Sequence, residues 1–329
     1  MLCTLTARAD AFALATPFRI SRGVKTVADV VTVEIASDGV VGRGEGVPYP
    51  RYGETVDSAL AAIATVRGAI EDGATRADLQ RLMPPGAARN AVDCALWDLE
   101  AKRAGRSVCE ILDLSPLAPT PTAMTVGLDT PPAMAAAARL LAHVPLLKIK
   151  VDRTDPEGQI RAVRDAAPNP RIIVDPNESW TVAEVERLQP LLVDLRIDLL
   201  EQPLPADADD ALEGFVSHIP IAADESAHVA GDVALLARKY QVLNVKLDKT
   251  GGLTGALALA DAAAAAGLGV MTGCMICSSL SIAPALIIAA RSGFVDLDGP
   301  LWLSADRPGG VRGHNGVLSV PEPGFWGTA

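Results

Sequence analysis

The sequence predicts an α/β barrel of eight parallel strands preceded by a smaller α+β domain. Three observations point to this fold. The chain has 329 residues, which is too long for one ordinary compact core. From about residue 122 to residue 299, short apolar strands alternate with helical stretches. A polar residue ends nearly every predicted strand, with a period near 25 residues, the length of one strand–helix unit.

The first third of the chain has a different sequence pattern. Residues 25–36 alternate in polarity and are rich in β-branched side chains, which predicts a strand. A glycine-punctuated segment follows at 41–46, and helical periodicity then covers 55–70 and 87–103. Strands followed by helices are typical of a self-contained α+β domain.

A proline-rich linker separates the two predicted domains. Three prolines fall within residues 115–121. We therefore expect the first domain to span residues 1–115 and the barrel to span residues 116–299. The tail from about 300 to 329 is rich in glycine and proline and is expected to pack back on the first domain.

Eight apolar segments in the barrel region have strand character. They are predicted at 122–126, 145–150, 171–175, 197–201, 219–223, 242–247, 268–272 and 294–297. The stretches between them have helical periodicity, for example at 131–142, 158–166, 181–193 and 252–266. Eight strands with intervening helices favour a closed parallel barrel, whose chemistry lies at the C-terminal ends of the strands.

Three carboxylates end consecutive predicted strands: Asp175, Glu201 and Asp224. Neighbouring strands lie about 4.8 Å apart, so the three groups can converge on one point. Oxygen ligands with no His or Cys nearby favour a hard divalent cation such as Mg²⁺. Capping a helix or pairing with a lysine is the better interpretation for any one of them alone. For three strand ends in register, we predict a metal site.

Three lysines occupy two opposite strands of the predicted barrel. Lys148 and Lys150 share one face of the second strand, about 6.6 Å apart. A solvated edge strand is the usual alternative, but apolar residues flank this pair. Lys246 ends the sixth strand, so Lys150 and Lys246 should face each other across the barrel mouth. This arrangement suits a 1,1-proton transfer, for which burial and nearby cations should lower the lysine pKa values. Lys249 is interpreted as a loop residue.

Two further carboxylates, Asp296 and Asp298, end the eighth predicted strand, and Thr125 ends the first. Two carboxylates on one strand face would bind an ammonium group well. Helix capping or a turn is the alternative, since Gly-Pro follows. Cys274 and Cys277 lack the second pair of a zinc site.

Composition excludes several classes of function. The net charge is −11 and the basic residues form no patch or tail, so a nucleic-acid partner is not expected. Five scattered cysteines favour a reducing compartment. The N-terminal stretch does not have the pattern of a signal peptide, and the apolar stretch 256–277 is interrupted by Asp and Gly, so we expect no membrane association and a cytoplasmic location.

The strand-end motifs resemble those of the enolase superfamily, in particular its muconate-lactonizing subgroup. The matching segments are Lys-x-Lys at 148–150, VDPNESW at 174–180, LLEQPLP at 199–205, ADES at 223–226 and NVKLDKTGGL at 244–253. The DLD segment at 296–298 is similar to the motif by which dipeptide epimerases hold a substrate ammonium. PFRISRG, PYPRYGE and DLDGPLWL look like segments of the L-Ala-D/L-Glu epimerases of Gram-negative bacteria.

The resemblance implies a modified TIM barrel, (β/α)₇β, with an N-terminal α+β capping domain. It implies Asp175, Glu201 and Asp224 as ligands of one Mg²⁺ per subunit. It implies Lys150 and Lys246 as acid/base catalysts, with Lys148 supporting the substrate carboxylate and Lys150. The substrate contacts implied for a small dipeptide are Asp296 and Asp298 at its ammonium, Thr125, and Arg22 at its glutamate side chain.

The activity implied is epimerisation of L-Ala-D-Glu to L-Ala-L-Glu in peptidoglycan recycling. N-acylamino acid racemisation, o-succinylbenzoate synthesis and cycloisomerisation by the same subgroup remain alternatives, as does a non-catalytic barrel. A homo-oligomer is compatible with the sequence.

Overall fold

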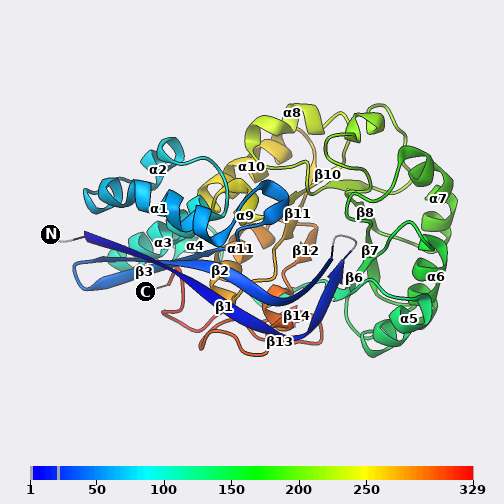
Figure 1. The fold of residues 1–329 in the computed structure, drawn as a ribbon, viewed down its shortest axis with the longest axis horizontal. Helices are drawn as coiled ribbons and strands as arrows, with labels where there is room; N and C mark the ends of the chain where they lie inside the picture. Colours follow the sequence, from blue (N-terminus) through cyan, green and yellow to red (C-terminus); the bar gives the residue numbers. More distant parts are fainter. Residues whose placement is uncertain (1–2, 21–22, 329) are drawn as a thin grey trace.

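An antiparallel sheet and four helices form the N-terminal domain (Figure 1). The computed structural model describes residues 3–20 and 23–328. The elements of this domain are β1 (Cys3–Ile20), β2 (Gly23–Ser37), β3 (Val40–Gly46), α1 (Val56–Glu71), α2 (Arg76–Leu82), α3 (Ala87–Ala104) and α4 (Val108–Ile111). The strand predicted at 25–36 lies within β2. Strand β1 and helix α2 were not predicted.

Three glycines let α3 lie directly on β3. A Cβ atom on Gly44 would be 2.1 Å from the carbonyl oxygen of Ala91, far inside van der Waals contact. Gly42 and Gly46 approach the α3 backbone in the same way, one helical turn to either side. This glycine ladder, residues 42, 44 and 46, therefore brings the backbones of strand and helix into contact.

Eight parallel strands form the nearly closed barrel that the sequence predicts. In order around the sheet they are β5 (Met124–Val126), β6 (Leu146–Lys150), β7 (Arg171–Asp175), β8 (Leu199–Glu201), β9 (Ile221–Ala223), β10 (Val242–Val245), β11 (Gly269–Gly273) and β12 (Phe294–Asp296). At the seam between the first and last strands, the Ala123 amide donates to the Val295 carbonyl at 2.7 Å. All eight strands lie within a few residues of the predicted positions.

Helices of unequal length connect the strands and cover the barrel. They are α5 (Pro131–Leu140), α6 (Pro156–Ala166), α7 (Val182–Asp194), α8 (Val233–Leu236), α9 (Leu247–Thr250), α10 (Leu253–Ala265) and α11 (Ser279–Ala289). The prediction of a helix in every connection is wrong between β8 and β9. That connection, all of it described, contains the 3₁₀ turn Asp209–Leu212 and no α-helix. Prolines at 203 and 205 disfavour a longer helix there.

The C-terminal tail contacts both parts of the molecule. Strand β14 (Val317–Leu318) pairs with β13 (Gly313–His314) on one side and with β4 (Thr120–Pro121), at the start of the barrel region, on the other. On the other side, the Trp326 indole donates to the Cys94 carbonyl of α3 at 3.1 Å.

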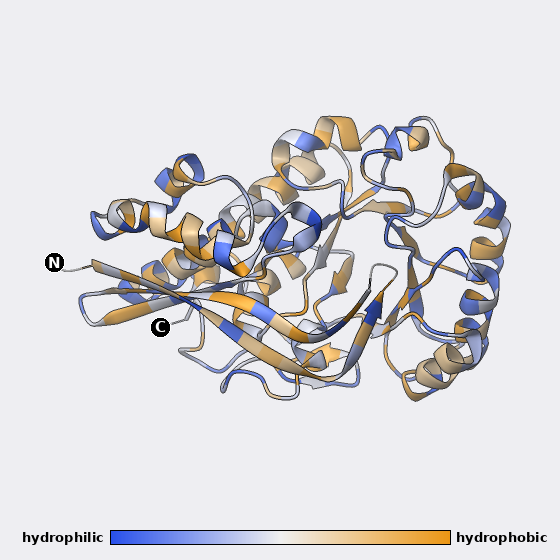
Figure 2. Ribbon diagram, in the orientation of Figure 1, coloured by the Kyte–Doolittle hydropathy of each residue, from blue (hydrophilic) through white to orange (hydrophobic). Residues whose placement is uncertain are grey.

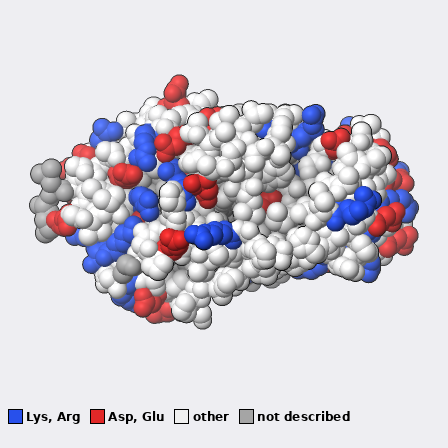
Figure 3. Space-filling view, turned by 90° about the horizontal axis from the view of Figure 1, so that it is seen from below, with Lys and Arg blue, Asp and Glu red and all other residues white. Residues whose placement is uncertain are grey.

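Hydrophobic residues gather on the barrel strands and on the helix faces packed against them (Figure 2). Basic and acidic side chains are interspersed on the face shown in Figure 3. Within residues 3–20 and 23–328, no helix combines the length and apolar character needed to cross a membrane.

Candidate active site

The inward side chains of the barrel strands change from apolar to polar over two residues. One apolar layer fills the interior and consists of Ala123, Leu146, Ile173, Leu199, Ala222, Val242, Met271 and Phe294. Two residues later on the same strand faces stand Thr125, Lys148, Asp175, Glu201, Asp224, Asn244, Gly273 and Asp296. Because side chains on a strand repeat every second residue, the same pattern that builds the core delivers a polar layer to the barrel mouth.

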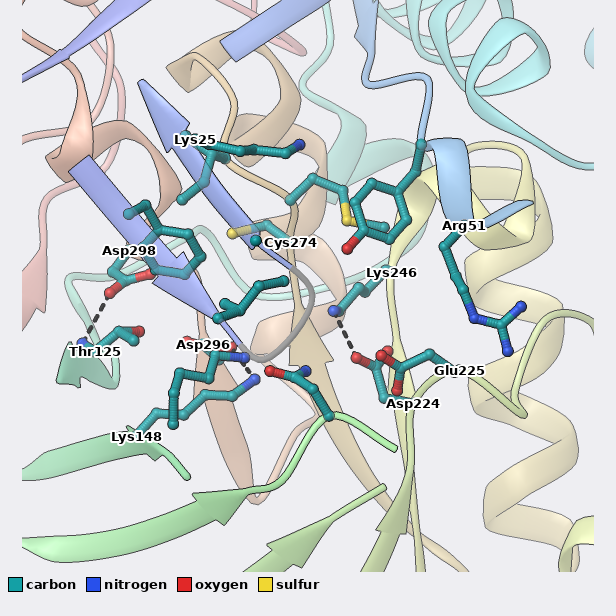
Figure 4. Close-up of a pocket in the computed structure, with 18 of the residues that line it drawn as sticks. Lys25, Arg51, Thr125, Lys148, Asp224, Glu225, Lys246, Cys274, Asp296 and Asp298 are labelled. Carbon is teal, nitrogen blue, oxygen red and sulfur yellow. Dashed lines mark hydrogen bonds and ion pairs between the residues drawn. The ribbon is translucent and has the colours of Figure 1, made fainter. Parts of the chain in front are cut away.

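A cavity of about 520 Å³ lies over this polar layer. Its floor includes Thr125, Lys148, Lys150, Asp224, Lys246, Asp296 and Asp298. Its cover comes from the N-terminal domain and includes Phe18, Ile20, Lys25, Tyr49, Arg51 and Tyr52. Figure 4 shows labelled side chains of both sets around one space, with Lys25 on the cover side and Lys148, Lys246 and Asp296 on the floor. Such a volume suits a small ligand of dipeptide size.

The predicted lysines and carboxylates are brought together in the polar layer at the barrel mouth, although Asp175 and Glu201 do not themselves line the cavity. Lys148 Nζ lies 2.9 Å from Asp296 Oδ2 and 2.7 Å from Glu201 Oε2. Lys150 Nζ lies 2.5 Å from Asp175 Oδ2. Strand β6, which carries both lysines, stands opposite β10 in the eight-stranded order.

Lys246 and Lys249 share the third carboxylate, Asp224. Lys246 Nζ lies 2.7 Å from Asp224 Oδ2, and Lys249 Nζ lies 2.7 Å from Asp224 Oδ1. Lys249 also donates to the Asn244 carbonyl at 3.0 Å and is fully buried within α9. The interpretation of Lys249 as a loop residue was therefore wrong, because α9 folds this side chain back beneath the strand end.

Burial and charge shift the pKa values of Asp175 and Glu201 in opposite directions. Burial raises the pKa of Asp175, but the ammonium groups of Lys150 and Lys148 outweigh it and lower the pKa to about 2. For Glu201, burial dominates; Lys148 offsets it only in part, and repulsion from Asp175 adds to it, so the pKa rises to about 8.

The expected lowering of the lysine pKa values is not found at Lys148 or Lys246. Burial lowers the pKa of Lys246, but the carboxylate of Asp224 outweighs it and raises the pKa above its ordinary value. Asp296 and Glu201 raise the pKa of Lys148 in the same way. The direction of each lysine pKa shift depends on the distance from the lysine to these carboxylates. That distance cannot be obtained from the sequence alone.

The three strand-end carboxylates suit a hard divalent cation by their chemistry. Asp175, Glu201 and Asp224 are buried on the adjacent strand ends of β7, β8 and β9 and offer only oxygen. Within the described residues, no three acidic, His or Cys side chains already surround one point as metal ligands. Each carboxylate instead contacts a lysine. Their all-oxygen, buried donor set on three adjacent strand ends nevertheless fits such a cation.

The two carboxylates at the end of the eighth barrel strand, Asp296 and Asp298, differ in their hydrogen-bond partners. Asp298 Oδ2 accepts hydrogen bonds from the Thr125 amide at 2.9 Å and from the Trp302 indole at 3.2 Å. Burial and the neighbouring charge of Asp296 raise the pKa of Asp298 to about 6. Asp296 Oδ1 is buried and accepts no hydrogen bond from the described residues. An acceptor remains available here for a cationic donor.

Cationic side chains of the N-terminal domain also reach the cavity. Arg22 lies outside the described residues. Arg51 holds Glu178 through two hydrogen bonds of 2.8 and 2.7 Å, which tie the cover to the loop after β7. Lys25 lies over the Tyr49 ring, 5.1 Å from its centre. Among the described residues, no carboxylate lies within ion-pair distance of Lys25. The sequence did not indicate Lys25 as a site residue.

Comparisons with known proteins extend these observations. The model of the mandelate racemase/muconate lactonizing enzyme N-terminal domain matches residues 2–113, and the enolase C-terminal domain-like model matches residues 133–325. The L-Ala-D/L-Glu epimerase of Escherichia coli is 46% identical, over 94% of this chain and 98% of its own. An N-acetyl-D-glutamate racemase of Pseudoalteromonas is 41% identical, over 91% of this chain and 96% of its own.

Solved structures agree with the sequence relatives. An Agrobacterium tumefaciens enolase family member, solved with sodium and L-Ala-L-Glu, has a TM-score of 0.96 and 46% identity, and covers 99% of this chain and 100% of its own. The Enterococcus faecalis dipeptide epimerase, solved with Mg and L-Leu-L-Tyr, has a TM-score of 0.91 and 29% identity, with 98% of each chain covered. Domain matches, fold and relatives together confirm the resemblance seen in the sequence: this chain belongs to the mandelate racemase/muconate lactonizing enzyme group of the enolase superfamily.

Proposed function

We propose that this protein is a Mg²⁺-dependent dipeptide epimerase that inverts the α-carbon of the C-terminal residue, converting L-Ala-D-Glu to L-Ala-L-Glu. The observation that carries the proposal is the placement of Lys150 and Lys246 at the ends of opposite strands, both lining one cavity. A planar carbon intermediate between them would have one ammonium or amine group on each face. A role in recycling peptidoglycan peptides follows from this substrate.

The two lysines would divide the proton transfer. One, as the neutral amine, removes the α-proton from its face, and the other, as the ammonium, returns a proton to the opposite face. Lys148, held by Glu201 and Asp296, would direct its ammonium toward the substrate carboxylate and keep Lys150 in place.

Asp175, Glu201 and Asp224 would hold one Mg²⁺ per subunit. When bound, this ion would neutralise negative charge that develops on the substrate carboxylate as the α-proton leaves. Lys150 and Lys246, which contact Asp175 and Asp224, would face the substrate from opposite sides.

The rest of the cavity fits the ends of an acidic dipeptide. Asp296 and Asp298 would hold the N-terminal ammonium, since Asp296 Oδ1 is buried with no described hydrogen-bond donor. Lys25, half-buried and without a described carboxylate partner, would attract the side-chain carboxylate of a C-terminal glutamate from the cover of the cavity. Arg22, in the adjacent segment, keeps the role that the resemblance implies for it.

N-acetylglutamate racemisation is the second candidate, because a relative of 41% identity carries that name. It would use the same lysines and metal ligands. An N-acetyl group, however, brings no positive charge to Asp296 and Asp298. It would leave the buried Asp296 Oδ1 without a donor and Asp298 without an ammonium partner. This cost favours the dipeptide.

The test is proton exchange in D₂O. Purified protein with Mg²⁺ is incubated with L-Ala-L-Glu, and the Glu α-proton is followed by NMR, with EDTA and N-acetyl-L-glutamate in parallel. Metal-dependent loss of the α-proton signal, together with the appearance of the second diastereomer, supports the proposal. Exchange of N-acetylglutamate in preference to the dipeptide would overturn the substrate assignment.

A further inference from the structure

The turn that carries Lys246 is held by the N-terminal domain. Lys246 follows β10 and directly precedes the one-turn helix α9. Within α9, Asp248 is buried, and its Oδ1 accepts hydrogen bonds from the Val47 amide at 2.8 Å and from Asn90 Nδ2 at 2.7 Å. Both donors belong to the N-terminal domain, in the segment after β3 and in α3.

Arg89, beside Asn90 on α3, fixes the other end of the same turn. Its guanidinium donates to the Thr250 carbonyl at 2.7 Å and to the Gly251 carbonyl at 3.1 Å. Gly251 has φ of 72°, and a Cβ atom there would lie 2.3 Å from Arg89 Nε. Helix α3 thus holds α9 at both ends, with no room for a larger residue at the contact.

Asp248 is also linked, through Val47, to the cover of the cavity. Val47, which donates to Asp248, lies two residues before Tyr49, where the cavity-lining segment begins. Within residues 3–20 and 23–328, Lys150 has no comparable link: it is the last residue of β6 and is paired in register with Asp175 of β7, so strands of the barrel hold its backbone.

We propose that Asp248 is a positioning residue that couples the N-terminal domain to Lys246, so that the two lysines depend on that domain to different extents. Asp248 does not line the cavity; it acts through the backbone of α9 and through the Val47 segment. The inference rests on the proposed epimerase function, because it concerns one of the two bases that this function requires.

The rate of net epimerisation cannot show that the two lysines depend on the N-terminal domain to different extents. The overall equilibrium constant fixes the ratio of kcat/KM for the two epimers, so a defect in either lysine lowers both directions together. Loss of the α-proton to D₂O is different, because the base on one face can remove a proton and return a deuteron without help from the other lysine. Exchange rates of the two epimers therefore report on the two lysines separately.

The experiment compares initial α-proton exchange of L-Ala-L-Glu and L-Ala-D-Glu by NMR in D₂O with Mg²⁺. Lys150→Ala and Lys246→Ala first identify which epimer reports on which lysine. Asp248→Ala is expected to slow exchange of the Lys246-dependent epimer at least about tenfold more than that of the other. Asp248→Asn, which keeps an acceptor oxygen for both donors, is expected to restore most of this ratio.

Asp98→Ala is the matched control. Asp98 is a buried carboxylate of α3 that accepts from the backbone amides of Arg43 and Gly327 at 2.8 and 2.7 Å, but among the described residues it has no hydrogen bond to α9. It should lower stability and leave the ratio unchanged. If Asp248→Ala does not fold, Asn90→Ala removes one of the two donors and should shift the ratio in the same direction, by less.

The outcomes separate the two proposals. Failure of the wild-type protein to exchange either epimer would overturn the epimerase function itself. Normal wild-type exchange, with both epimers slowed equally by Asp248→Ala or with neither affected, would overturn the positioning role alone.

Discussion

Replacing Asp298 by asparagine isolates the charge of the proposed ammonium subsite. Asp298 Oδ2 accepts hydrogen bonds from the Thr125 amide and the Trp302 indole at 2.9 and 3.2 Å. The asparagine carbonyl oxygen can occupy the same point and keep both bonds. The substitution therefore removes a negative charge next to Asp296 and changes little else.

The size of the effect follows from Coulomb's law. With an effective dielectric constant of about 20, a carboxylate and an ammonium about 4 to 8 Å apart attract each other by about 4 to 2 kcal/mol. Each tenfold change in rate corresponds to about 1.4 kcal/mol, so kcat/KM for L-Ala-L-Glu should fall about 30- to 1,000-fold. N-acetyl-L-glutamate lacks the ammonium, and its turnover should not fall.

The assay is best run at pH 8, above the raised pKa of Asp298 of about 6, where the carboxylate is charged. As the pH falls through 6, wild-type kcat/KM for the dipeptide should fall toward that of the variant, which has no such group to titrate. Mg²⁺ affinity should be unchanged in the variant. Equal losses for the dipeptide and the N-acetyl compound, or unchanged dipeptide kinetics, would refute the assignment.

Three further results are expected. Lys25→Met should raise KM for L-Ala-L-Glu about tenfold and leave KM for L-Ala-L-Leu unchanged in steady-state assays, because only the first substrate carries a side-chain charge; equal effects on both would contradict the role of Lys25. The pKa of Asp248 is raised by burial from 3.8 to about 7, so the stability that this group contributes is full below about pH 4 and is lost as the pH rises through 7. Urea unfolding should therefore show wild-type stability declining relative to Asp248→Asn between pH 4.5 and 8, by at most about 4 kcal/mol, and parallel curves would count against this. Gly44→Ala should cost more than about 3 kcal/mol in thermal unfolding, because the added methyl would meet the α3 backbone at 2.1 Å. Gly68→Ala, in an open position on α1, should be neutral or stabilising by up to about 1 kcal/mol, and similar melting of the two variants would be the contrary result.

The barrel could be predicted from the sequence because its core and its site follow one alternation. Each strand except β11, which has Gly273, carries an apolar residue in the interior layer and a polar one two residues later, so Ile173 with Asp175 and Leu199 with Glu201 mark both the strand and its C-terminal end. Strand β1 has no such signal. Its residues alternate between exposed and half-buried, with few fully buried positions, since one face of the long hairpin stays open.

Parts of the site depend on contacts that the sequence does not contain. Lys249 is buried because a four-residue helix folds it beneath Asp224, and helices this short have no periodicity to detect. Lys25 reaches the cavity only because the β1–β2 hairpin extends over the barrel (Figure 1). Burial lowers the pKa of Lys246, but the carboxylate of Asp224, 2.7 Å from Lys246 Nζ across neighbouring strand ends, is the main cause that raises it.

The glycine ladder of β3 has a consequence for how specificity can change in this chain. Where side chains separate a helix from a strand, a substitution of a different size moves the helix. Here backbone meets backbone, so the spacing of α3 is insensitive to drift in the surrounding core. Arg89 and Asn90 sit on this fixed helix and hold the Lys246 turn. The loops over the cavity can therefore vary and accept new dipeptides. The position of Lys246 depends instead on α3, which side-chain changes in the core do not easily displace.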